Sequence, residues 1–348
     1  RARRRGESRI TALASAVRAL SAMLDGGPPL EDALALVARD AAHAEVGAQL
    51  EYARTRVLAG SALSDALSEA PGTLPVLLPA MTRAGESAGA LGSALGRVAD
   101  DLEERAELTG QLRAALLYPV VLAIAAVIGV TLLLTLVVPR FATIITDSGQ
   151  ALPWSTRALL GVSGVLAQWW WMLLPIGALA ITTVWRWGRT AAGRAWWHAA
   201  RLRWPVIGPL EESLGAARVL RTLALLLPTG VPLLTALDVA RQAVGNTVIA
   251  ARVSGATRRL RDGASVGAAF DGVLPRLAVQ LLAAGERGGD LGALAARAAL
   301  HFEQVTRRQL RSAVALVEPA IIVCFGGLVA FVALAMLQAI YGINARTL

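Results

Sequence analysis

The stretch Pro119–Val138 reads PVVLAIAAVIGVTLLLTLVV and contains no charged residue. A helix rises about 1.5 Å per residue, so about 20 apolar residues span the roughly 30 Å hydrocarbon core of a bilayer. Two other stretches meet this criterion, because residues 158–185 and 319–345 are also free of charge. The sequence therefore predicts three transmembrane helices, at residues 118–139, 166–187 and 318–341.

The composition favours a membrane protein without an enzymatic or metal centre. Of the 348 residues, 55% are hydrophobic and only 17% are charged, against about 25% charged in an average soluble domain. The single cysteine, Cys324, excludes a multi-cysteine metal site, and the three histidines lie far apart in the sequence. No Gly-x-x-x-x-Gly-Lys-Ser/Thr loop for nucleotide phosphates is present. We therefore expect no catalytic residue, no cofactor and no metal.

The net charge of +9 raises the alternative of a nucleic-acid-binding protein. However, Trp196, Trp197 and Trp204 interleave with arginines directly after the second apolar stretch. Tryptophan and arginine together suit the anionic headgroups of a membrane surface. We expect membrane lipids, and not nucleic acid, to bind this segment.

Arginines lie unevenly on the two sides of each apolar stretch, and positive residues are retained on the cytoplasmic side. The arginines on the richer sides are Arg97, Arg105 and Arg113, then Arg186, Arg189, Arg194, Arg201 and Arg203, then Arg307, Arg308 and Arg311. All three stretches predict the same orientation. Residues 1–117 and 188–317 are expected in the cytoplasm, and the loop 140–165 and the tail 342–348 outside.

The sequence also contains an internal repeat. Gly27 and Pro29 recur as Gly230 and Pro232, so the Gly-x-Pro motif appears twice. AGESAGALGSAL at 84–95 recurs as AGERGGDLGALA at 284–295. The motif at 284–295 lies 200 residues after the motif at 84–95. At the same separation Glu103 matches Glu303, and Pro119 matches Pro319 at the start of the apolar stretches. One duplicated unit therefore includes the helix that enters the membrane.

Each copy is predicted to be a bundle of about six helices, because apolar residues recur at helical spacing and no alternating strand pattern appears. Glycine and proline mark the boundaries of the helices. In the first copy, Gly27 and Pro29 lie between two helices, and a later helix is expected to stop at Gly85. The last helix is expected to begin near Ser87. The fold class is thus an all-α membrane protein.

Three acidic residues have both a structural and a functional interpretation. Glu86 and Glu286 follow Gly85 and Gly285, and each could bind a partner or a cation. Because the acid occurs twice at the same place, we favour a structural role beside a helix N-terminus. Glu318 lies at the membrane edge, where an ionisable group is costly and often functional. It is therefore a possible functional residue.

Several short motifs resemble the F-domain family of inner-membrane platform proteins from type II secretion and type IV pilus machines. Each motif is short, but their order, duplication and position relative to the apolar stretches are specific. They are Gly27-x-Pro29-Leu30 and Gly230-Val231-Pro232-Leu233, the Ala-Gly-Glu triplets at 84–86 and 284–286, Tyr118-Pro119, Val138-Pro139-x-Phe141, Leu152-Pro153-x-x-Thr156, and Glu318-Pro319.

The resemblance implies a non-enzymatic scaffold in the bacterial inner membrane. Such proteins contact a cytoplasmic secretion ATPase and pass its motion to pilin or pseudopilin subunits. The resemblance also implies self-association, without giving the number of copies. Two rival classes stay open: a subunit of a transporter, which can also be built on a repeat, and a membrane enzyme, which would need a nucleophile–base pair or metal ligands.

Two charged segments are candidates for the ATPase contact. Residues 97–107 of the first copy are rich in acid, and residues 252–262 of the second copy are rich in base. Charge complementarity sets the register of a protein contact and its rate of encounter. We expect the contact to use Asp101, Glu103, Glu104, Arg258, Arg259 and Arg261.

Overall fold

The computed structural model describes residues 8–140, residue 143, isolated positions between 157 and 188, and residues 190–344. The chain divides into two units. The first unit comprises residues 1–111 and 195–310, and the second comprises residues 112–194 and 311–348. All regular secondary structure in the described ranges is helical.

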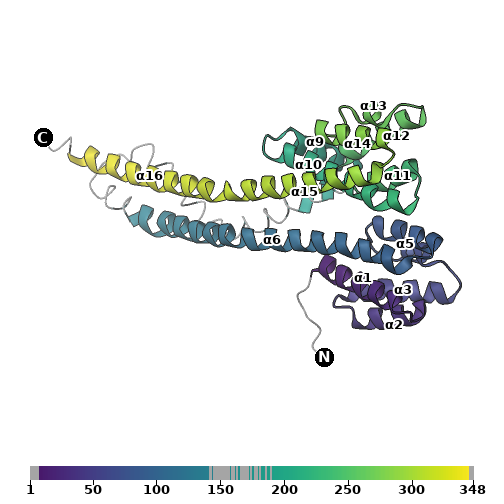
Figure 1. Cartoon of the computed structure of the whole chain (residues 1–348). Helices are drawn as coiled ribbons and strands as arrows, with labels where there is room; N and C mark the ends of the chain where they lie inside the picture. Colours follow the sequence, from purple (N-terminus) through teal and green to yellow (C-terminus); the bar gives the residue numbers. More distant parts are fainter. Residues whose placement is uncertain are drawn as a thin grey trace. The chain divides into compact units, whose positions relative to one another are not determined.

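The helices before the described gap are α1 (Arg9–Asp25), α2 (Leu30–Asp40), α3 (Ala44–Leu58), α4 (Leu63–Glu69), α5 (Leu77–Ala88), α6 (Leu91–Leu132) and the π-helix η1 (Leu133–Val137). Those after it are α9 (Ala191–Arg203), α10 (Ile207–Leu226), the 3-10 helix η2 (Leu227–Thr229), α11 (Leu233–Ala243), α12 (Thr247–Arg261), α13 (Val266–Phe270), α14 (Arg276–Gly288), α15 (Leu291–Ala315) and α16 (Val317–Asn344). Figure 1 labels them.

Helices recur along the chain with the offsets of the sequence repeat. α2 and α11 have 11 residues each, and α3 and α12 have 15 each. In both pairs, the first residues of the two helices are as far apart in the sequence as the two Gly-x-Pro motifs. The first residues of α6 and α15 are as far apart as the two Ala-Gly-Glu motifs. Leu34 and Leu237, an equivalent pair, are both fully buried. Equivalent residues therefore occupy equivalent helices in the two halves of the chain.

The Gly-x-Pro motifs form equivalent turns. Gly27 has φ 90° and Gly230 has φ 83°, a left-handed conformation that glycine adopts without steric cost. Pro29 and Pro232 are the N-cap residues of α2 and α11, and their carbonyls accept hydrogen bonds from Ala33 and Ala236. The fixed φ of proline suits the start of a helix. Both turns thus end one helix and begin the next.

The helix expected to stop at Gly85 instead continues to Ala88. Gly89 caps the C-terminus of α5 and Gly289 caps that of α14, both in the left-handed conformation. The carbonyls of Gly85 and Gly285 accept bonds of 2.9 and 3.0 Å from the amides of Ala90 and Asp290, the pattern of a Schellman motif. The helix expected from Ser87 consequently begins at Leu91.

Gly85 and Gly285 are required by close packing. A Cβ atom on Gly85 would lie 2.6 Å from the Cβ of Ala94, and one on Gly285 would lie 2.9 Å from the Cα of Leu291. Real Cβ atoms do not approach other atoms so closely. Glycine therefore lets α5 and α14 pack against the helices that follow them.

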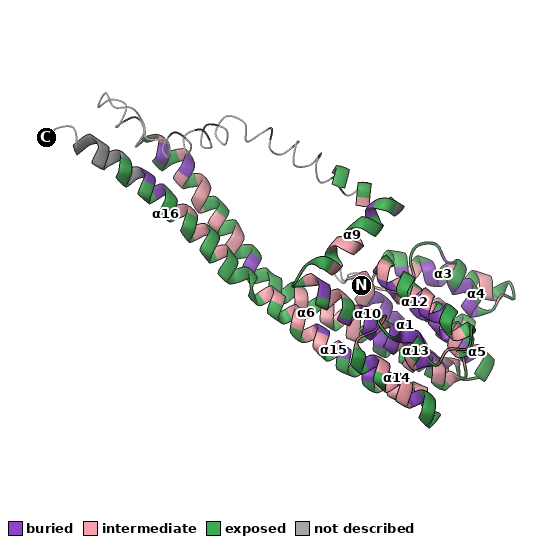
Figure 2. Ribbon diagram, turned by 90° about the horizontal axis from the view of Figure 1, so that it is seen from above, coloured by how far each residue is buried: buried purple, intermediate pink, exposed green. Residues whose placement is uncertain are grey.

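The first unit has one continuous apolar core to which both copies contribute. Figure 2 shows the buried residues concentrated where the helices of this unit pack together. The largest fully buried side chains are Phe270, Leu34, Leu63, Leu77, Leu78, Met81, Leu95, Leu102, Leu220, Leu223, Leu226 and Leu237.

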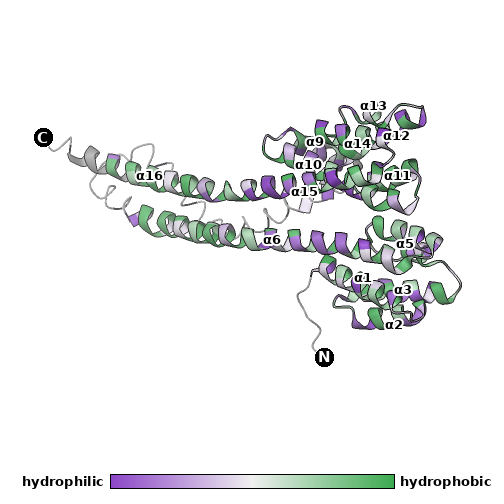
Figure 3. Cartoon of the chain, viewed as in Figure 1, coloured by the Kyte–Doolittle hydropathy of each residue, from purple (hydrophilic) through white to green (hydrophobic). Residues whose placement is uncertain are grey.

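In the second unit, α16 and the part of α6 after residue 111 have the length and composition to cross a membrane. The most apolar 18-residue window of α6 is only 6% buried and that of α16 is 0% buried, so both present apolar side chains on their surfaces. Figure 3 colours both segments mainly hydrophobic. Where they meet, Leu134 and Val138 pack with Val332 and Ala335. An apolar surface of this extent matches a lipid environment.

Three sequence predictions fall at or beyond the limits of the described residues. The second expected transmembrane segment (166–187) and the external loop (140–165) lie almost entirely outside them, as does the tail after Asn344. α16 continues past the predicted boundary at 341 to Asn344.

Pro119 lies inside α6, which is unbroken, whereas Leu316 separates α15 from α16 shortly before Pro319.

Candidate functional site

Glu86 caps a helix that lies earlier in its own copy. Its Oε1 accepts a hydrogen bond of 2.6 Å from the Leu63 amide, and its Oε2 accepts one of 2.6 Å from the Ser64 hydroxyl. These donors form the first turn of α4, where the amides have no partner within the helix. The sequence suggested that Glu86 stands beside the N-terminus of the next helix along the chain. In the structure the capped helix is instead α4.

Glu286 has the equivalent position in the second copy. Both of its oxygens accept the Val266 amide at 2.9 Å, so the carboxylate caps α13. A carboxylate at a helix N-terminus is favoured by the hydrogen bond and by the helix dipole. Both acids of the Ala-Gly-Glu motifs thus tie α5 and α14 to the short helices before them.

Five charged side chains from both copies meet inside the first unit. We call Asp101, Glu104, Arg221, Glu303 and Arg307 the ionic junction. Arg221 lies 3.3 Å from Glu104, 3.7 Å from Asp101 and 4.0 Å from Glu303. Glu104 also pairs with Arg307. The junction thus joins α6 of the first copy to α10 and α15 of the second.

The ionic junction is largely removed from water. The Asp101 side chain is 7% exposed and that of Glu303 is 14% exposed. One oxygen of Glu303 and the Nε atoms of Arg221 and Arg307 are buried without a hydrogen-bond partner. Burial raises the pKa of Glu303 to about 7, although Arg221 acts in the opposite direction. Burial of the neighbouring guanidinium of Arg218 lowers its pKa.

The repeat explains how the junction arose. Arg18 and Glu103 of the first copy match Arg221 and Glu303 of the second. In the first copy this pair is close, with 2.8 Å between Arg18 Nε and Glu103 Oε1, and the bond lowers the pKa of Glu103. In the second copy Arg221 is shared with the acids of α6, so its distance to Glu303 rises to 4.0 Å.

The acidic residues predicted to contact an ATPase do not share one solvent-exposed face. Asp101 and Glu104 belong to the ionic junction, because the second copy packs over this side of α6, and Glu103 pairs with Arg18. Sequence reasoning missed Arg221, Glu303 and Arg307 as their partners. The repeated Arg–Glu pairing was a usable signal, but the contact between copies was not visible in the sequence.

The basic residues of this prediction have a different environment. Arg258, Arg259 and Arg261 are exposed at the C-terminal end of α12. In the described part of the chain, none of the three forms an ion pair. They therefore present an unneutralised basic surface.

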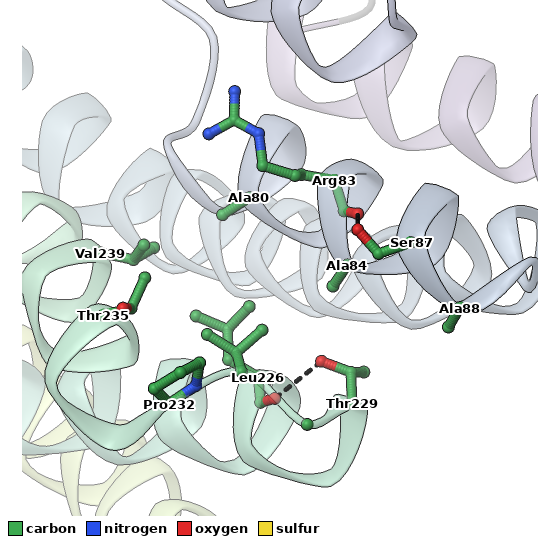
Figure 4. Close-up of a pocket in the computed structure, with 12 residues that line it drawn as sticks. Ala80, Arg83, Ala84, Ser87, Ala88, Leu226, Thr229, Pro232, Thr235 and Val239 are labelled. Carbon is green, nitrogen blue, oxygen red and sulfur yellow. Dashed lines mark hydrogen bonds between the residues drawn. The ribbon is translucent and has the colours of Figure 1, made fainter.

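A pocket of about 390 Å³ lies between the two copies within the first unit. Figure 4 shows α5 on one side, with Ala84 and Ser87, and the α10–η2–α11 turn on the other, with Leu226 and Pro232. The lining is mainly apolar. Its one charged side chain, Arg83, pairs with Asp65 at 2.6 Å on the surface. The pocket therefore lacks the convergent polar groups of a catalytic site.

Tyr118 and Glu318 occupy matching positions of the repeat and approach each other in the second unit. The Tyr118 hydroxyl donates to a Glu318 oxygen at 3.4 Å, and both side chains are exposed. Further along, Phe325 lies 3.6 Å from the space a Cβ on Gly129 would fill. Cys324 is exposed on α16. Among the described residues, no group of three His, Cys, Asp or Glu could hold a metal ion.

These features define a helical membrane protein whose charged residues join repeated elements to one another. The chain belongs to the family of type II secretion system protein F, whose family model matches it twice, at residues 16–139 and 219–339. The two matched segments begin and end at equivalent positions of the two copies, which confirms the internal repeat.

The chain is similar along most of its length to members of this family from several bacteria. It is 35% identical to type II secretion system protein F of Aeromonas hydrophila over 98% of this chain and 88% of that protein. It is also 35% identical to the Pseudomonas aeruginosa protein of the same name, over 95% and 82% of the two chains. A type IV pilus assembly protein PilC from Thermus thermophilus shares 35% identity over 66% of this chain and 58% of that protein.

Proposed function

We propose that the chain is a non-enzymatic inner-membrane platform of a type II secretion or type IV pilus machine. The observation that carries this proposal is the double match to the protein F family model, with relatives named for both machines. Deleting the gene in its own bacterium should abolish protein secretion or surface pili, and the intact gene should restore them. A deletion strain that retains both contradicts the proposal.

The partners of such a platform are a cytoplasmic secretion ATPase and pilin or pseudopilin subunits. A separate ATPase is needed because this chain contains no nucleotide-binding loop. The unpaired arginines of α12 offer a surface for an acidic face of that ATPase. Purification of the tagged full chain should retain the ATPase and the pilin subunits, and their consistent absence counts against this part.

The proposed topology has three transmembrane helices, with residues 1–117 and 188–317 forming two repeated bundles in the cytoplasm. It rests on the arginine asymmetry and on the recurring helices. In a Cys324→Ala background, Ser148→Cys should react with an impermeant thiol reagent in intact cells, and Ser254→Cys should not. The reverse labelling pattern would invert the topology.

Membrane lipids are the proposed partners of α9. Trp197 on α9 and Trp204 directly after it are exposed, and the Arg201 guanidinium lies 5.8 Å from the centre of the Trp197 ring. An exposed aromatic and basic helix suits the headgroup region. Brominated lipids in proteoliposomes should quench these tryptophans. Unchanged emission from a protein that retains only Trp196, Trp197 and Trp204 would argue against this contact.

Glu318 is the proposed functional residue at the membrane edge. It is exposed, and its one hydrogen bond, to Tyr118, is at the long end of the normal range. We expect Glu318→Gln, which removes the charge but keeps an oxygen that can accept the bond, to reduce secretion or piliation at unchanged protein level. Tyr118→Phe, which removes the bond, should have little effect. Loss of function in Tyr118→Phe with normal function in Glu318→Gln would assign the role to the bond and not to the charge.

The alternative of a transporter subunit predicts a different phenotype. A transporter needs polar or broken helices near the middle of the membrane, whereas the described parts of the two apolar helices carry no charge between Pro119 and Val138 or between Pro319 and Asn344. Loss of solute uptake with secretion and pili intact would favour the transporter.

A further inference from the structure

The contact between the two repeat copies in the first unit is head-to-tail. α5 of the first copy packs on the turn from α10 through η2 to α11 of the second. The repeat supplies an equivalent of each partner: α14 corresponds to α5, and the α1–α2 turn corresponds to the α10–α11 turn. Figure 1 shows α5 beside α11, whereas α14 and α2 lie apart. Within the described residues, α14 therefore lacks the kind of partner that α5 has, and the α1–α2 turn lacks the kind of partner that the α10–α11 turn has.

The exposure of equivalent residues supports this difference. Val239 lines the pocket beside α5 and is half-buried, whereas its equivalent Leu36 is 45% exposed. On the opposite side, Ala84 is 7% exposed in the contact, whereas its equivalent Ala284 is only half-buried. Leu277, near the start of α14, is 40% exposed. Both unused surfaces therefore keep apolar atoms in water.

The two unused surfaces also carry opposite charges. Asp32 lies at the start of α2, at the place of Thr235, which lines the pocket in the second copy. Arg276 and Arg287 lie on α14, and Arg287 has the place of Ser87 on α5. In the described part of the chain, none of these three charged residues forms an ion pair. The surfaces are thus complementary to each other and not to themselves.

We infer that α14 of one molecule binds the α1–α2 turn of a second copy of this chain, as α5 binds the α10–α11 turn within one molecule. We assign the partner as a second copy of this chain, because the equivalent surfaces already bind each other within one molecule. A head-to-tail contact of this kind leaves a free surface at each end. It therefore builds rings or open filaments, and not closed two-fold dimers.

Cysteine cross-linking between different molecules tests the geometry. In Figure 4, Ala80 and Val239 lie at the same end of the pocket, and their equivalents are Gln280 and Leu36. Gln280→Cys and Leu36→Cys are placed on separately tagged full chains, both with Cys324→Ala, and reconstituted together in lipid. We expect disulfide-linked dimers that contain both tags. Cross-links only between identical positions, or none at all, overturn the inference.

Charge reversal provides a second measurement with an internal control. Arg287→Glu or Asp32→Arg alone should raise the dissociation constant of self-association about tenfold, and the two together should restore most of the affinity. Arg258→Glu, outside both surfaces, should have no effect. Single reversals that leave the mass distribution unchanged in nanodiscs would overturn the contact. Since only the purified chain is measured, the result is independent of the proposed role in secretion.

Discussion

Glu103 and Glu303 are the same residue of the repeat, yet they differ in their effect on stability. Glu103 lies at the surface with Arg18, and this bond lowers its pKa. Glu303 is enclosed by α6, α10 and α15, and burial raises its pKa to about 7. In the unfolded chain both acids have a pKa near 4.3. Ionisation therefore favours the folded state at Glu103 and opposes it at Glu303.

Glu303→Gln should consequently stabilise the protein as the pH rises. Between the unfolded pKa and about 7, the unfolded state ionises first, so the wild type loses stability over this window. The expected gain for Glu303→Gln is up to about 3 kcal/mol at pH 8 and less at pH 5. Thermal unfolding of the full chain in detergent at both pH values measures this difference.

Glu103→Gln is the matched control, because it makes the same change at the equivalent position. The contribution of Glu103 is present above its unfolded pKa and is lost as the pH falls through its lowered folded pKa. Glu103→Gln should therefore destabilise the protein at pH 8. A gain in stability from both variants would show that the ionic junction does not hold Glu303 as described.

The capping acids give a prediction about the stability of the short helices that they cap. Glu86→Ala removes a carboxylate that accepts bonds from the Leu63 amide and the Ser64 hydroxyl. We expect a loss of about 1–2 kcal/mol in the free energy of unfolding, the usual effect of losing an N-cap. Glu107→Ala, on the exposed face of α6, should change stability by less than about 0.5 kcal/mol. Equal effects would mean that the cap contributes nothing.

At the scale of helices, two glycines should respond to alanine with opposite signs. A Cβ on Gly85 would overlap Ala94, so Gly85→Ala should destabilise α5 packing by about 1–3 kcal/mol. Gly255 lies inside α12 with open space around it, so Gly255→Ala should stabilise the helix by up to about 1 kcal/mol. Thermal unfolding of the two variants, side by side, tests the packing of α5. A neutral Gly85→Ala would show that α5 and α6 can separate.

Helix existence was predictable from the sequence, whereas helix ends and tertiary contacts were not. The apolar stretches and the Gly-x-Pro turns carry strong local signals, because proline fixes its own φ and glycine permits a positive φ. The end of α5 was placed at Gly85, since the sequence alone does not distinguish a glycine needed for packing from the capping Gly89. The ionic junction has no local signal, because Glu104 is separated in the sequence by most of a repeat from Arg221 and by a whole repeat from Arg307.

For the whole molecule, the structure changes which variant tests the ATPase contact. Reversing Asp101, Glu103 and Glu104 together would place positive charge against Arg18, Arg221 and Arg307. Breaking a buried ion pair costs about 3–5 kcal/mol, so this variant should lose its fold along with any partner. Its failure to bind would say nothing about a contact surface.

Arg258, Arg259 and Arg261 allow a cleaner experiment, because they are exposed on α12 and form no ion pair in the described part of the chain. Reversing all three to Glu should leave the melting temperature within a few degrees of the wild type, since surface changes alter stability by about 0.5 kcal/mol or less each. The same variant should lose the ATPase in co-purification, because like charges at a protein contact repel. Arg308→Glu, at another exposed arginine, serves as the control for charge reversal outside α12. If the triple variant keeps the ATPase, the contact lies on another surface; if it also melts early, α12 supports the fold and not the partner.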